Sequence, residues 1–478
     1  MVLVTLVFGV GGLTAQNRQL LYDFYEIPQS AMLNPGVKTI QQWHAGLPLL
    51  SGLTFQAGTS GITVNDLFAD DGIDFTTKLR DRAINGLGQN DEFGASGTIE
   101  VFSGGFRTAN RPNDYYSFGV YGEGFISQFW PKDIAILAFE GNAPNINRRF
   151  SLNHFANQGE AVNVFHFGLN RKLNQKWTVG VRAKLYSSVF EFRSAKNDGY
   201  FVTTVGENNL LRNTLVADVR MRTSGVDELL DILTDDSAAT REELSKLLIR
   251  KSLLGGNLGL GMDFGFTHEL SRQTVITGSV LDLGFIYYNK NVKNYTLNGA
   301  ASNEGIEIIL PEDLTNLTSD IWQELVDEIE RLVPFETDED AYLAMRPIKL
   351  YGSIRHNFGQ KDPRSNDCDC DIKPKINLDR FDYINSVGAQ LFMMQRPRGP
   401  QLALTAFFQK RFGNFLTLKT TYTADKYSLS NIGMGMSWQL GKFNFYAMAD
   451  NLLGYTNIPD SHYASFHLGF NIISWNGN

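Results

Sequence analysis

Apolar and polar residues alternate along segment after segment in the second half of the chain. The alternation is clearest in residues 401–411, 431–440 and 463–473, where one side of each segment is apolar and the other is mainly polar or small. A period of two predicts β-strands with one apolar and one polar face. Strands of about ten residues joined by short polar turns are typical of a transmembrane β-barrel, apolar toward lipid and polar toward the lumen.

Applied to the whole chain, the same criterion predicts an all-β membrane protein. We expect a closed antiparallel transmembrane β-barrel of about fourteen strands in the outer membrane of a Gram-negative bacterium. Residues 43–478 are predicted to form this barrel. The predicted strands are 43–57, 95–106, 114–125, 161–172, 176–190, 257–268, 274–288, 347–358, 385–396, 401–410, 415–424, 430–440, 443–450 and 463–473.

The lengths of the connections support this count. Barrels of this kind have short periplasmic turns and long outer loops. If both termini are periplasmic, the short links fall on one side and the long insertions on the other, with the link 359–384 as the one long exception. The short links are 172–175, 269–273, 411–414 and 441–442, and the long insertions are 58–94, 126–160, 191–256 and 289–346.

The first residues predict export. Residues 1–15, MVLVTLVFGVGGLTA, form an apolar run that ends in small residues, as a secretory signal peptide does. We predict cleavage after Ala15 and, because a basic start is missing, a true start codon further upstream; a buried N-terminal strand is the alternative. Residues 16–42 follow as a turn-rich segment that we expect to plug the lumen or to lie in the periplasm.

Two of the outer insertions have helical periodicity. Leucines and isoleucines recur every three or four residues in 226–250 and again in 312–333, and the other positions are mostly acidic. Each helix is either a lid packed on the loops, with a solvated acidic face, or a docking surface for a protein partner. The residues assigned to docking are Leu229, Leu233, Ile321 and Leu325.

Charged residues inside the predicted strands fall on the polar side of the alternation. Because a charge that faces lipid near the midplane costs roughly 2–4 kcal/mol, this placement supports the barrel and predicts a polar interior. The charges either line a pathway or fill an occluded lumen, and the pattern favours neither. The predicted lumen-facing charges are Lys176, Arg182, Lys184, Asp263, Lys349, Arg355, Lys419 and Asp450.

The remaining chemistry is sparse. The net charge is −8 and no basic patch is present, so nucleic acid is not an expected partner. Cys368 and Cys370 are the only cysteines. A local disulfide ranks first for them because export favours it, although a C-x-C ring is tight; free thiols rank second and a metal site third.

Catalytic motifs are also missing. The chain contains no H-E-x-x-H, P-loop or G-x-S-x-G pattern, and we predict neither an enzyme nor a cofactor or metal. Ser151 with His154, and Ser461 with His462, are close in sequence, but such neighbours need not meet in space.

Three short motifs carry a resemblance to a known group. Asn34-Pro35-Gly36 resembles the Asn-Pro-Ala/Gly hatch motif of the fatty-acid-transporter superfamily of outer-membrane barrels. Residues 279–285 and 446–452 resemble its PorV-like members in Bacteroidota, and residues 29–36 match best a Bacteroidota family of unknown function. The resemblance covers most of the chain. It implies a fourteen-stranded barrel with an N-terminal hatch at Asn34, Pro35 and Gly36.

The resemblance also implies two functions. Some relatives import hydrophobic compounds, and others are accessory subunits of secretion or barrel-assembly machines. The helical insertions are not part of the transporter plan, and the chain ends without the usual terminal aromatic, for which Phe470 or Trp475 would substitute. The insertions favour an accessory subunit whose partners are other outer-membrane or periplasmic proteins.

Two alternatives stay open beside the accessory subunit. Hatch-gated transport of a hydrophobic small molecule predicts a continuous apolar pocket beside residues 34–36. A surface enzyme acting on lipid or glycan would require a nucleophile and a base assembled in the loops.

Overall fold

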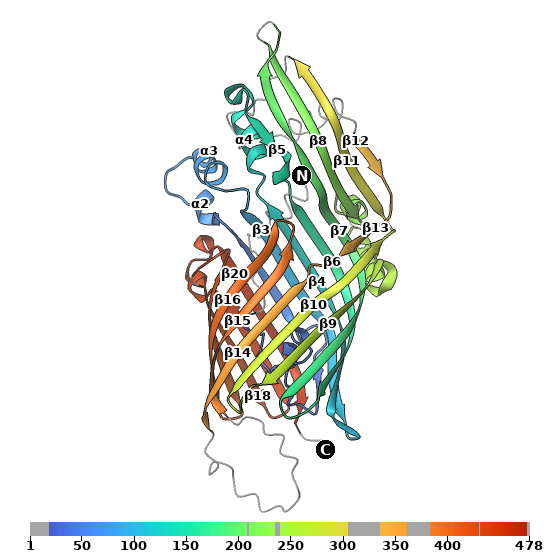
Figure 1. Ribbon diagram of the computed structural model, residues 1–478, viewed down its shortest axis with the longest axis vertical. Coiled ribbons are helices and arrows are strands. Elements are labelled where there is room, and N and C mark those ends of the chain that lie inside the picture. Colours follow the sequence, from blue (N-terminus) through green and yellow to red (C-terminus); the bar gives the residue numbers. More distant parts are fainter. Residues whose placement is uncertain are drawn as a thin grey trace, which may run out of the picture.

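The computed structural model describes residues 19–207, 210–234, 240–304, 335–360, 383–429 and 431–475. Its main body is a closed antiparallel β-barrel with fourteen strand positions (Figure 1). Two positions are shared by two short strands, because β1 and β2 together form the first position and β13 and β14 the eighth. The wall strands are β1 (Trp43–Gly46), β2 (Leu53–Thr59), β3 (Glu92–Thr108), β4 (Arg111–Phe129), β6 (Asn157–Lys172), β7 (Trp177–Val205), β9 (Asn257–Glu269), β10 (Thr274–Tyr288), β13 (Tyr342–Met345), β14 (Lys349–Gln360), β15 (Tyr383–Arg396), β16 (Gly399–Phe412), β17 (Leu416–Asp425), β18 (Asn431–Leu440), β19 (Phe443–Asp450) and β20 (Tyr463–Ser474).

The barrel closes between its last and first strands. β20 pairs with β1 around Ser474 and Trp43 and with β2 around Leu468 and Leu53. The first wall strand is interrupted at residues 47–52, which contain Pro48, yet its backbone remains hydrogen-bonded to both neighbouring strands. This interruption explains why the alternation in residues 43–57 is weak.

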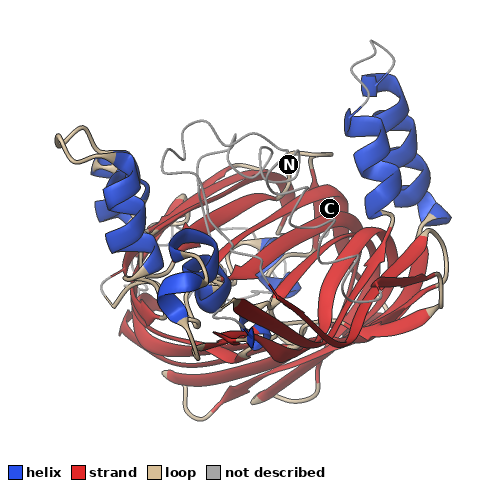
Figure 2. Ribbon diagram, turned by 90° about the horizontal axis from the view of Figure 1, so that it is seen from above, coloured by secondary structure: helices blue, strands red, loops and turns tan. Residues whose placement is uncertain are grey.

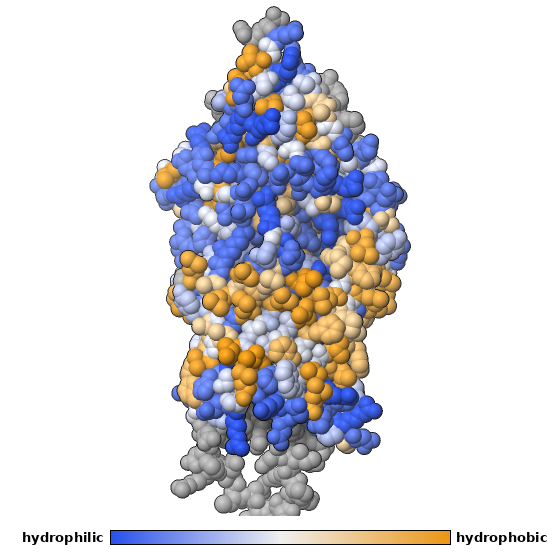
Figure 3. Space-filling model, viewed as in Figure 1, coloured by the Kyte–Doolittle hydropathy of each residue, from blue (hydrophilic) through white to orange (hydrophobic). Residues whose placement is uncertain are grey.

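The barrel exterior is apolar where the alternation predicts it. In β16, Leu402, Leu404 and Phe408 are exposed, whereas Thr405 and Gln409 on the opposite face are fully buried. Other strands repeat this pattern, and on the face that Figure 3 shows, the exposed apolar side chains form a belt across the lower half of the molecule. In water such a belt would be unfavourable, and it is the surface that a membrane-spanning barrel presents to lipid.

Above the belt, part of the wall continues as an outer sheet. β7 runs past the barrel rim and pairs there with β8 and β5, while β11 pairs with β8 and β12 (Figure 1). We predicted loops for most of residues 191–256 and 289–346, and this was wrong because the strands keep pairing with one another beyond the barrel. The additional strands are β5 (Arg149–Ser151), β8 (Leu211–Ser224), β11 (Val292–Glu304) and β12 (Phe335–Asp338).

Short helices stand on two opposite sides of the same rim (Figure 2). The helices predicted within 226–250 are confirmed as α5 and α6, whereas the segment 312–333 lies outside the described residues. None of the helices in the described residues is long and apolar enough to cross a bilayer. The helical segments are η1 (Pro28–Met32), α2 (Val64–Phe68), α3 (Phe75–Lys78), η2 (Leu79–Ile84), α4 (Lys132–Glu140), η3 (Ala143–Asn145), η4 (Leu152–His154), α5 (Val226–Thr234), α6 (Thr240–Arg250), η6 (Lys251–Gly255), η9 (Leu452–Thr456) and η10 (Ile458–Asp460).

The lumen is filled by the chain itself. Residues 19–42, called the plug from here on, run through the barrel before β1 begins. Leu20, Leu21, Phe24 and Ile27 of the plug are almost fully buried and form one apolar cluster with side chains of β10, β14, β15 and β19. The interior is therefore a packed core with polar parts. The predicted signal peptide, residues 1–15, and Cys368 and Cys370 lie outside the described residues.

Candidate functional site

The candidate site is the lumen, where the plug, a chain of charged side chains and a small cavity meet. The first part of the plug is held by ion pairs as well as by its apolar cluster. Asp23 lies 2.8 Å from the guanidinium of Arg355, and Glu26 lies 2.6 Å from that of Arg411. Lys419 donates a 2.6 Å hydrogen bond to the backbone oxygen of Tyr22. All of these groups are buried, so each pair is shielded from water.

The second part of the plug contains the predicted hatch motif. Asn34, Pro35 and Gly36 form a tight turn in which the Asn34 side-chain oxygen accepts a 2.8 Å hydrogen bond from the Gly36 N–H. The turn lies directly on the wall at two glycines. A Cβ at Gly180 would come within 2.0 Å of the Pro35 oxygen, and one at Gly265 within 2.1 Å of the Asn34 side-chain oxygen. Only glycine permits so close an approach of two backbones.

Wall side chains hold this part of the plug by its backbone. Arg182 donates to the oxygens of Ala31 and Met32, at 3.0 and 2.5 Å, and Ser279 donates to Leu33 at 2.6 Å. Around the turn, Asn170 donates to Pro35 and Val37, Thr267 donates to Gly36, and Asn34 donates to Phe266, at 2.7, 2.8, 2.8 and 3.2 Å respectively. These seven bonds are side chain to backbone, so the plug is docked in the barrel and adds no strand to it.

Eight charged side chains form an alternating chain across the lumen, called the charge network from here on. Each cation lies between two anions or ends the chain, and the successive contacts are 2.6, 2.9, 2.6, 3.0, 2.6, 3.6 and 2.9 Å long. Four positive charges thus balance four negative ones, as a buried charge requires. In order, the members are Arg182, Asp263, Lys184, Asp282, Lys349, Glu123, Arg346 and Glu160.

The structure places seven of the eight predicted lumen charges inside the barrel. Arg182, Lys184, Asp263 and Lys349 belong to the charge network, and Arg355 and Lys419 contact the plug. Asp450 is buried beside Ser465, which donates a 2.9 Å hydrogen bond to it.

The prediction for Lys176 was wrong. Lys176 is exposed in the turn before β7, where its N–H bonds to the side chain of Asn174. The turn precedes the first paired residue of the strand, so the alternation does not apply to it.

Half of the members of the charge network were not among the lumen charges predicted from the sequence. Glu123 and Glu160 follow the alternation of their strands, but aromatic and aliphatic residues on both faces of these strands hide it. Asp282 lies at a β-bulge, where the pairing of β10 with β9 shifts between Val280 and Leu283 and Asp282 takes a φ of 61°. The bulge turns both Leu281 and Asp282 inward, which strict alternation cannot predict.

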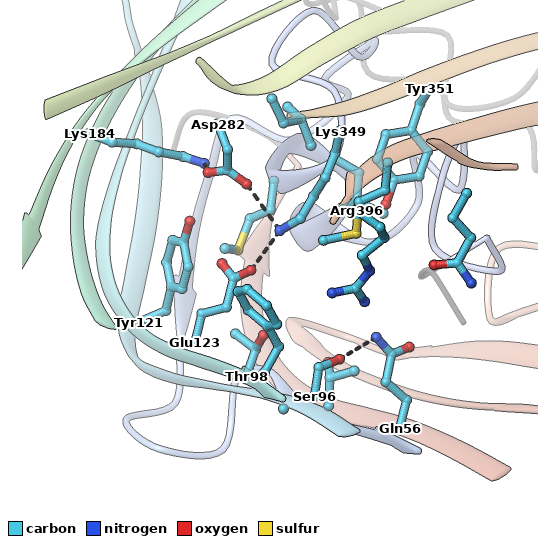
Figure 4. Close-up of a pocket in the computed structure, with 18 residues that line it drawn as sticks. Gln56, Ser96, Thr98, Tyr121, Glu123, Lys184, Asp282, Lys349, Tyr351 and Arg396 are labelled. Carbon is cyan, nitrogen blue, oxygen red and sulfur yellow. Dashed lines mark hydrogen bonds and ion pairs between the residues drawn. The ribbon is translucent and has the colours of Figure 1, made fainter. Parts of the chain in front are cut away.

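A cavity of about 70 Å³ lies between the plug and the end of the barrel that carries the helices. Met32 and Leu33 of the plug form part of its lining. Figure 4 shows Lys349 between Asp282 and Glu123 at this cavity, in contact with both. Phe125 and Met394 contribute apolar surface, whereas Glu123, Lys184, Asp282, Lys349 and Arg396 contribute charge. The continuous apolar pocket expected beside residues 34–36 is therefore absent from the described lumen, because charged and polar side chains interrupt it.

The predicted docking helices lie outside the barrel. α5 and α6 contact each other, and Glu228 binds Arg250 and Lys251 at 2.7 and 2.8 Å. Leu229 is half-buried in this hairpin, and Ile249 and Leu253 nearby are exposed. The side chain of Leu233 and the residues Ile321 and Leu325 are outside the described part.

Neither sequence pair considered for catalysis forms a nucleophile and base in the described structure. Ser461 donates to the Tyr463 oxygen, while His462 lies against the Thr59 oxygen. His154 lies 3.8 Å from Asp133, and burial lowers its pKa despite this carboxylate. The described residues also contain no group of three His, Cys, Asp or Glu side chains that could hold a metal ion.

Comparison with known proteins gives one family and several solved structures of low sequence identity. Residues 35–450 match the model of a family of unknown function, DUF5723. No curated protein sequence matches the chain.

Three solved structures are similar to the chain at very low sequence identity. The toluene transporter TbuX of Ralstonia pickettii is 10% identical over 94% of both chains, with a TM-score of 0.37. A FadL homologue of Pseudomonas aeruginosa is 11% identical over 97% of this chain and 99% of its own, with a TM-score of 0.39. A mutant of the monoaromatic hydrocarbon channel TodX is 8% identical over 98% and 97%, with a TM-score of 0.40. At these values the similarity does not extend to ligand or mechanism.

Proposed function

The chain belongs to the DUF5723 family of unknown function, and we propose that this member is a hatch-gated channel for a small amphipathic molecule in the bacterial outer membrane. The observation that carries the proposal is the position of the cavity. Met32 and Leu33 of the plug line it, so a movement of the plug would open it toward the other end of the barrel. The channel is closed at rest and has no enzymatic role.

The two halves of the plug differ in how they are held, which supports a local movement. Residues 19–27 bury large apolar side chains and form a fixed anchor. Residues 31–37 are held by six hydrogen bonds from wall side chains to their backbone and by one from the Asn34 side chain to the Phe266 oxygen, and Leu33 is their one residue in the apolar cluster of the anchor. At about 1 kcal/mol net for each bond, releasing them costs about 7 kcal/mol, which water entering the gap or a bound ligand would offset in part.

The lining of the cavity favours an amphipathic molecule, and not a pure hydrocarbon, as the transported ligand. Phe125, Met394 and Leu33 would contact an apolar part, while the charged and amide side chains opposite would hold a polar end. A wholly apolar ligand would leave buried charges desolvated without compensation.

The orientation of the protein in the membrane is proposed from its apolar belt and its turns. The apolar belt fits a bilayer, and we propose that the end with short turns faces the periplasm together with both chain termini. Export would use the predicted signal peptide, residues 1–15. The helices and the outer sheet then face the outside of the cell.

Solute entry into proteoliposomes tests the channel. Liposomes with the purified protein are placed in butyl glucoside, an uncharged amphipathic solute, or in sucrose, and swelling is followed by light scattering. We expect swelling in butyl glucoside to be faster than in empty liposomes and no increase in sucrose. A rate equal to that of empty liposomes would refute the channel, and equal rates for both solutes would show an open pore.

A matched pair of variants locates the pathway. Ser96→Phe places a ring in the cavity, which Ser96 lines, and should abolish the swelling. Thr420→Phe places the same ring on the exposed lipid-facing side of β17 and should leave the rate unchanged. Equal rates for the two variants would place the pathway elsewhere.

An accessory role in a secretion or assembly complex is the second candidate. The exposed Ile249 and Leu253 beside the α5–α6 hairpin favour it, because large apolar side chains that are exposed close together are typical of docking sites. Native membranes solubilised in mild detergent should then yield a complex with other outer-membrane or periplasmic proteins. Ile249→Asp should release that complex, whereas a monomer from native membranes would argue against the role.

A further inference from the structure

Four large apolar side chains are exposed beside the α5–α6 hairpin, where the chain returns to the barrel. They are Leu248 and Ile249 at the end of α6 and Leu253 and Leu254 in η6, and they are called the rim patch from here on. Ile249 and Leu253 are the most open of the four, with exposed fractions of 59% and 69%. Apolar side chains exposed so close together are unfavourable in water, so the rim patch indicates a contact with lipid or with another molecule.

The rim patch lies directly above the lipid-facing side of β9. η6 ends at Gly255, and the first outward side chains of β9 are Leu258 and Leu260, which belong to the apolar belt. Leu254 and Leu258 are four positions apart, with no charged residue between them, so their backbones lie at most about 14 Å from each other. Residues 226–255 are the yellow-green helices at the right of the rim in Figure 1, and Figure 3 shows apolar surface at that place in the same view. The rim patch therefore continues the belt upward.

An aromatic side chain marks the upper boundary of the belt on the next strand. β10 pairs with β9 at Phe285 and Leu260, and Tyr287, two residues further toward the rim, is exposed on the same outward face. Tyr287 pairs in turn with the exposed Leu343 of β13. A tyrosine at the end of an apolar belt is typical of the boundary between hydrocarbon and lipid headgroups. The rim patch adjoins this boundary.

The backbone beside the rim patch is suited to a place without water. η6 contains residues with non-helical angles, so it cannot bond all of its own carbonyls as a regular helix does. The oxygen of Lys251 instead accepts a 2.6 Å hydrogen bond from the Ser187 hydroxyl. The oxygens of Gly255 and Gly256 accept from the ammonium of Lys290, at 3.2 and 3.0 Å. Irregular backbone beside lipid is tolerated where its polar groups have such partners, and these bonds also fix η6 to the wall.

The hairpin lies across the barrel axis. Figure 2 looks along that axis and shows the two helices lengthwise, outside the barrel wall. A helix that lies in the plane of a membrane surface has this orientation. One turn further from the barrel, the exposed side chains of α6 are charged, and Glu242 and Lys246 form an ion pair of 2.6 Å. The apolar surface is thus limited to the end of the helix that meets the belt.

We propose that the rim patch is a membrane anchor, whose four side chains insert into the outer leaflet of the bilayer and hold the α5–α6 hairpin on the membrane surface. This inference goes beyond the proposed channel and does not depend on it. A protein partner is the alternative occupant of these side chains, but the continuity with the belt and the bonded backbone favour lipid. Asp227 of α5 lies 2.7 Å from Lys293 of β11, so the anchor would brace the base of the outer sheet against the membrane.

Quenching by brominated lipid tests the anchor. Leu253→Trp places an indole on the rim patch, and the full-length protein is reconstituted into vesicles of phosphatidylcholine or of its dibrominated form, whose bromine atoms quench tryptophans that contact the acyl chains. The emission of wild-type protein, which has six tryptophans, is subtracted in both vesicles. We expect most of the emission that the new tryptophan adds to be lost in brominated vesicles. No partner protein is present, so lipid alone accounts for such a loss.

Two matched variants calibrate the measurement. Leu404→Trp places the same ring on the exposed belt and should be quenched. Asn298→Trp places it on an exposed position of β11 in the outer sheet and should not be quenched. Migration of unheated and heated samples in gels confirms that each variant is a folded barrel. Ile249→Trp repeats the test from α6 and also replaces Leu253→Trp if that variant does not fold.

The outcomes decide between lipid and protein. Quenching of Leu253→Trp and Ile249→Trp close to that of Leu404→Trp would support the anchor. Quenching no stronger than that of Asn298→Trp would overturn it and leave the rim patch to a protein partner. Quenching at residue 253 without quenching at residue 249 would also overturn the anchor as stated, because α6 would then not touch lipid. If the rim patch is quenched but no butyl glucoside enters the liposomes, the anchor stands and the transport proposal fails.

Discussion

A methyl group at residue 265 should release the plug. Gly265 lies on β9 directly under the Asn34–Gly36 turn. A Cβ there would be 2.1 Å from the Asn34 side-chain oxygen and 3.0 Å from the Gly36 nitrogen, the two atoms that the turn joins by a 2.8 Å hydrogen bond. Gly265→Ala therefore cannot be accommodated unless the turn leaves the wall, because the nearest atoms belong to the turn itself.

The magnitude follows from the bonds that the turn makes. Moving it away from the wall breaks the four hydrogen bonds that link residues 34–37 to Phe266, Thr267 and Asn170. At about 1 kcal/mol net each, the closed state loses about 4 kcal/mol, which is about a thousandfold change in the ratio of closed to open plug. The strand pairing of the barrel does not depend on these bonds, so the wall should stay intact.

Conductance across a planar lipid bilayer measures this shift. Wild-type protein should be mostly closed, and Gly265→Ala should open frequently under the same voltage. Gly352→Ala is the matched control, because a Cβ at Gly352 meets only one atom, the Thr277 oxygen at 4.0 Å. If Gly265→Ala folds into an intact barrel and conducts no more than Gly352→Ala, then the turn does not hold the plug and the reasoning fails.

Three other perturbations follow from the packing. Asp282→Asn removes the carboxylate shared by Lys184 and Lys349, at 2.6 and 3.0 Å, and should destabilise the folded barrel by about 3–5 kcal/mol in urea titrations; a loss below 1 kcal/mol would show that the charge network contributes little. Lys419→Met replaces a buried lysine that has no ion pair within the described residues, so stability in the same titration should be unchanged or higher, and a clear loss would contradict this. Leu404→Arg puts a charge on the exposed apolar belt and should cost about 2–4 kcal/mol of folding free energy in phospholipid vesicles, with a neutral effect arguing that residue 404 lies outside the bilayer.

The sequence predicts the barrel well because each wall strand carries its own signal. One face meets lipid and the other meets the core, so the period of two survives even where the strands pair over long distances. β16 and β18 match the predicted ranges to within two residues at either end. The same signal finds Arg182, Lys184 and Asp263, which are charged residues at regular inward positions.

The features that the sequence does not reveal depend on tertiary contacts. The bulge at Asp282 breaks the alternation locally. The outer sheet of β8 and β11 lies above the apolar belt, and its strands lack the apolar stripe of the barrel wall. The plug contains apolar residues without a regular period, because each side chain fits a different part of the wall.

The long reach of the plug contacts has a consequence for biogenesis. Glu26 pairs with Arg411, 385 positions later in the chain. The backbone oxygen of Tyr22 accepts a hydrogen bond from Gln390, 368 positions later, and both partners lie in strands synthesised late. The plug therefore cannot take its final place until most of the wall exists, although it is synthesised before the wall strands. Loop closure over such distances is slow, so the apolar side chains of the plug stay exposed until the wall has formed and must be shielded from aggregation until then. A periplasmic chaperone that shields it, or membrane insertion that precedes its docking, would meet that need.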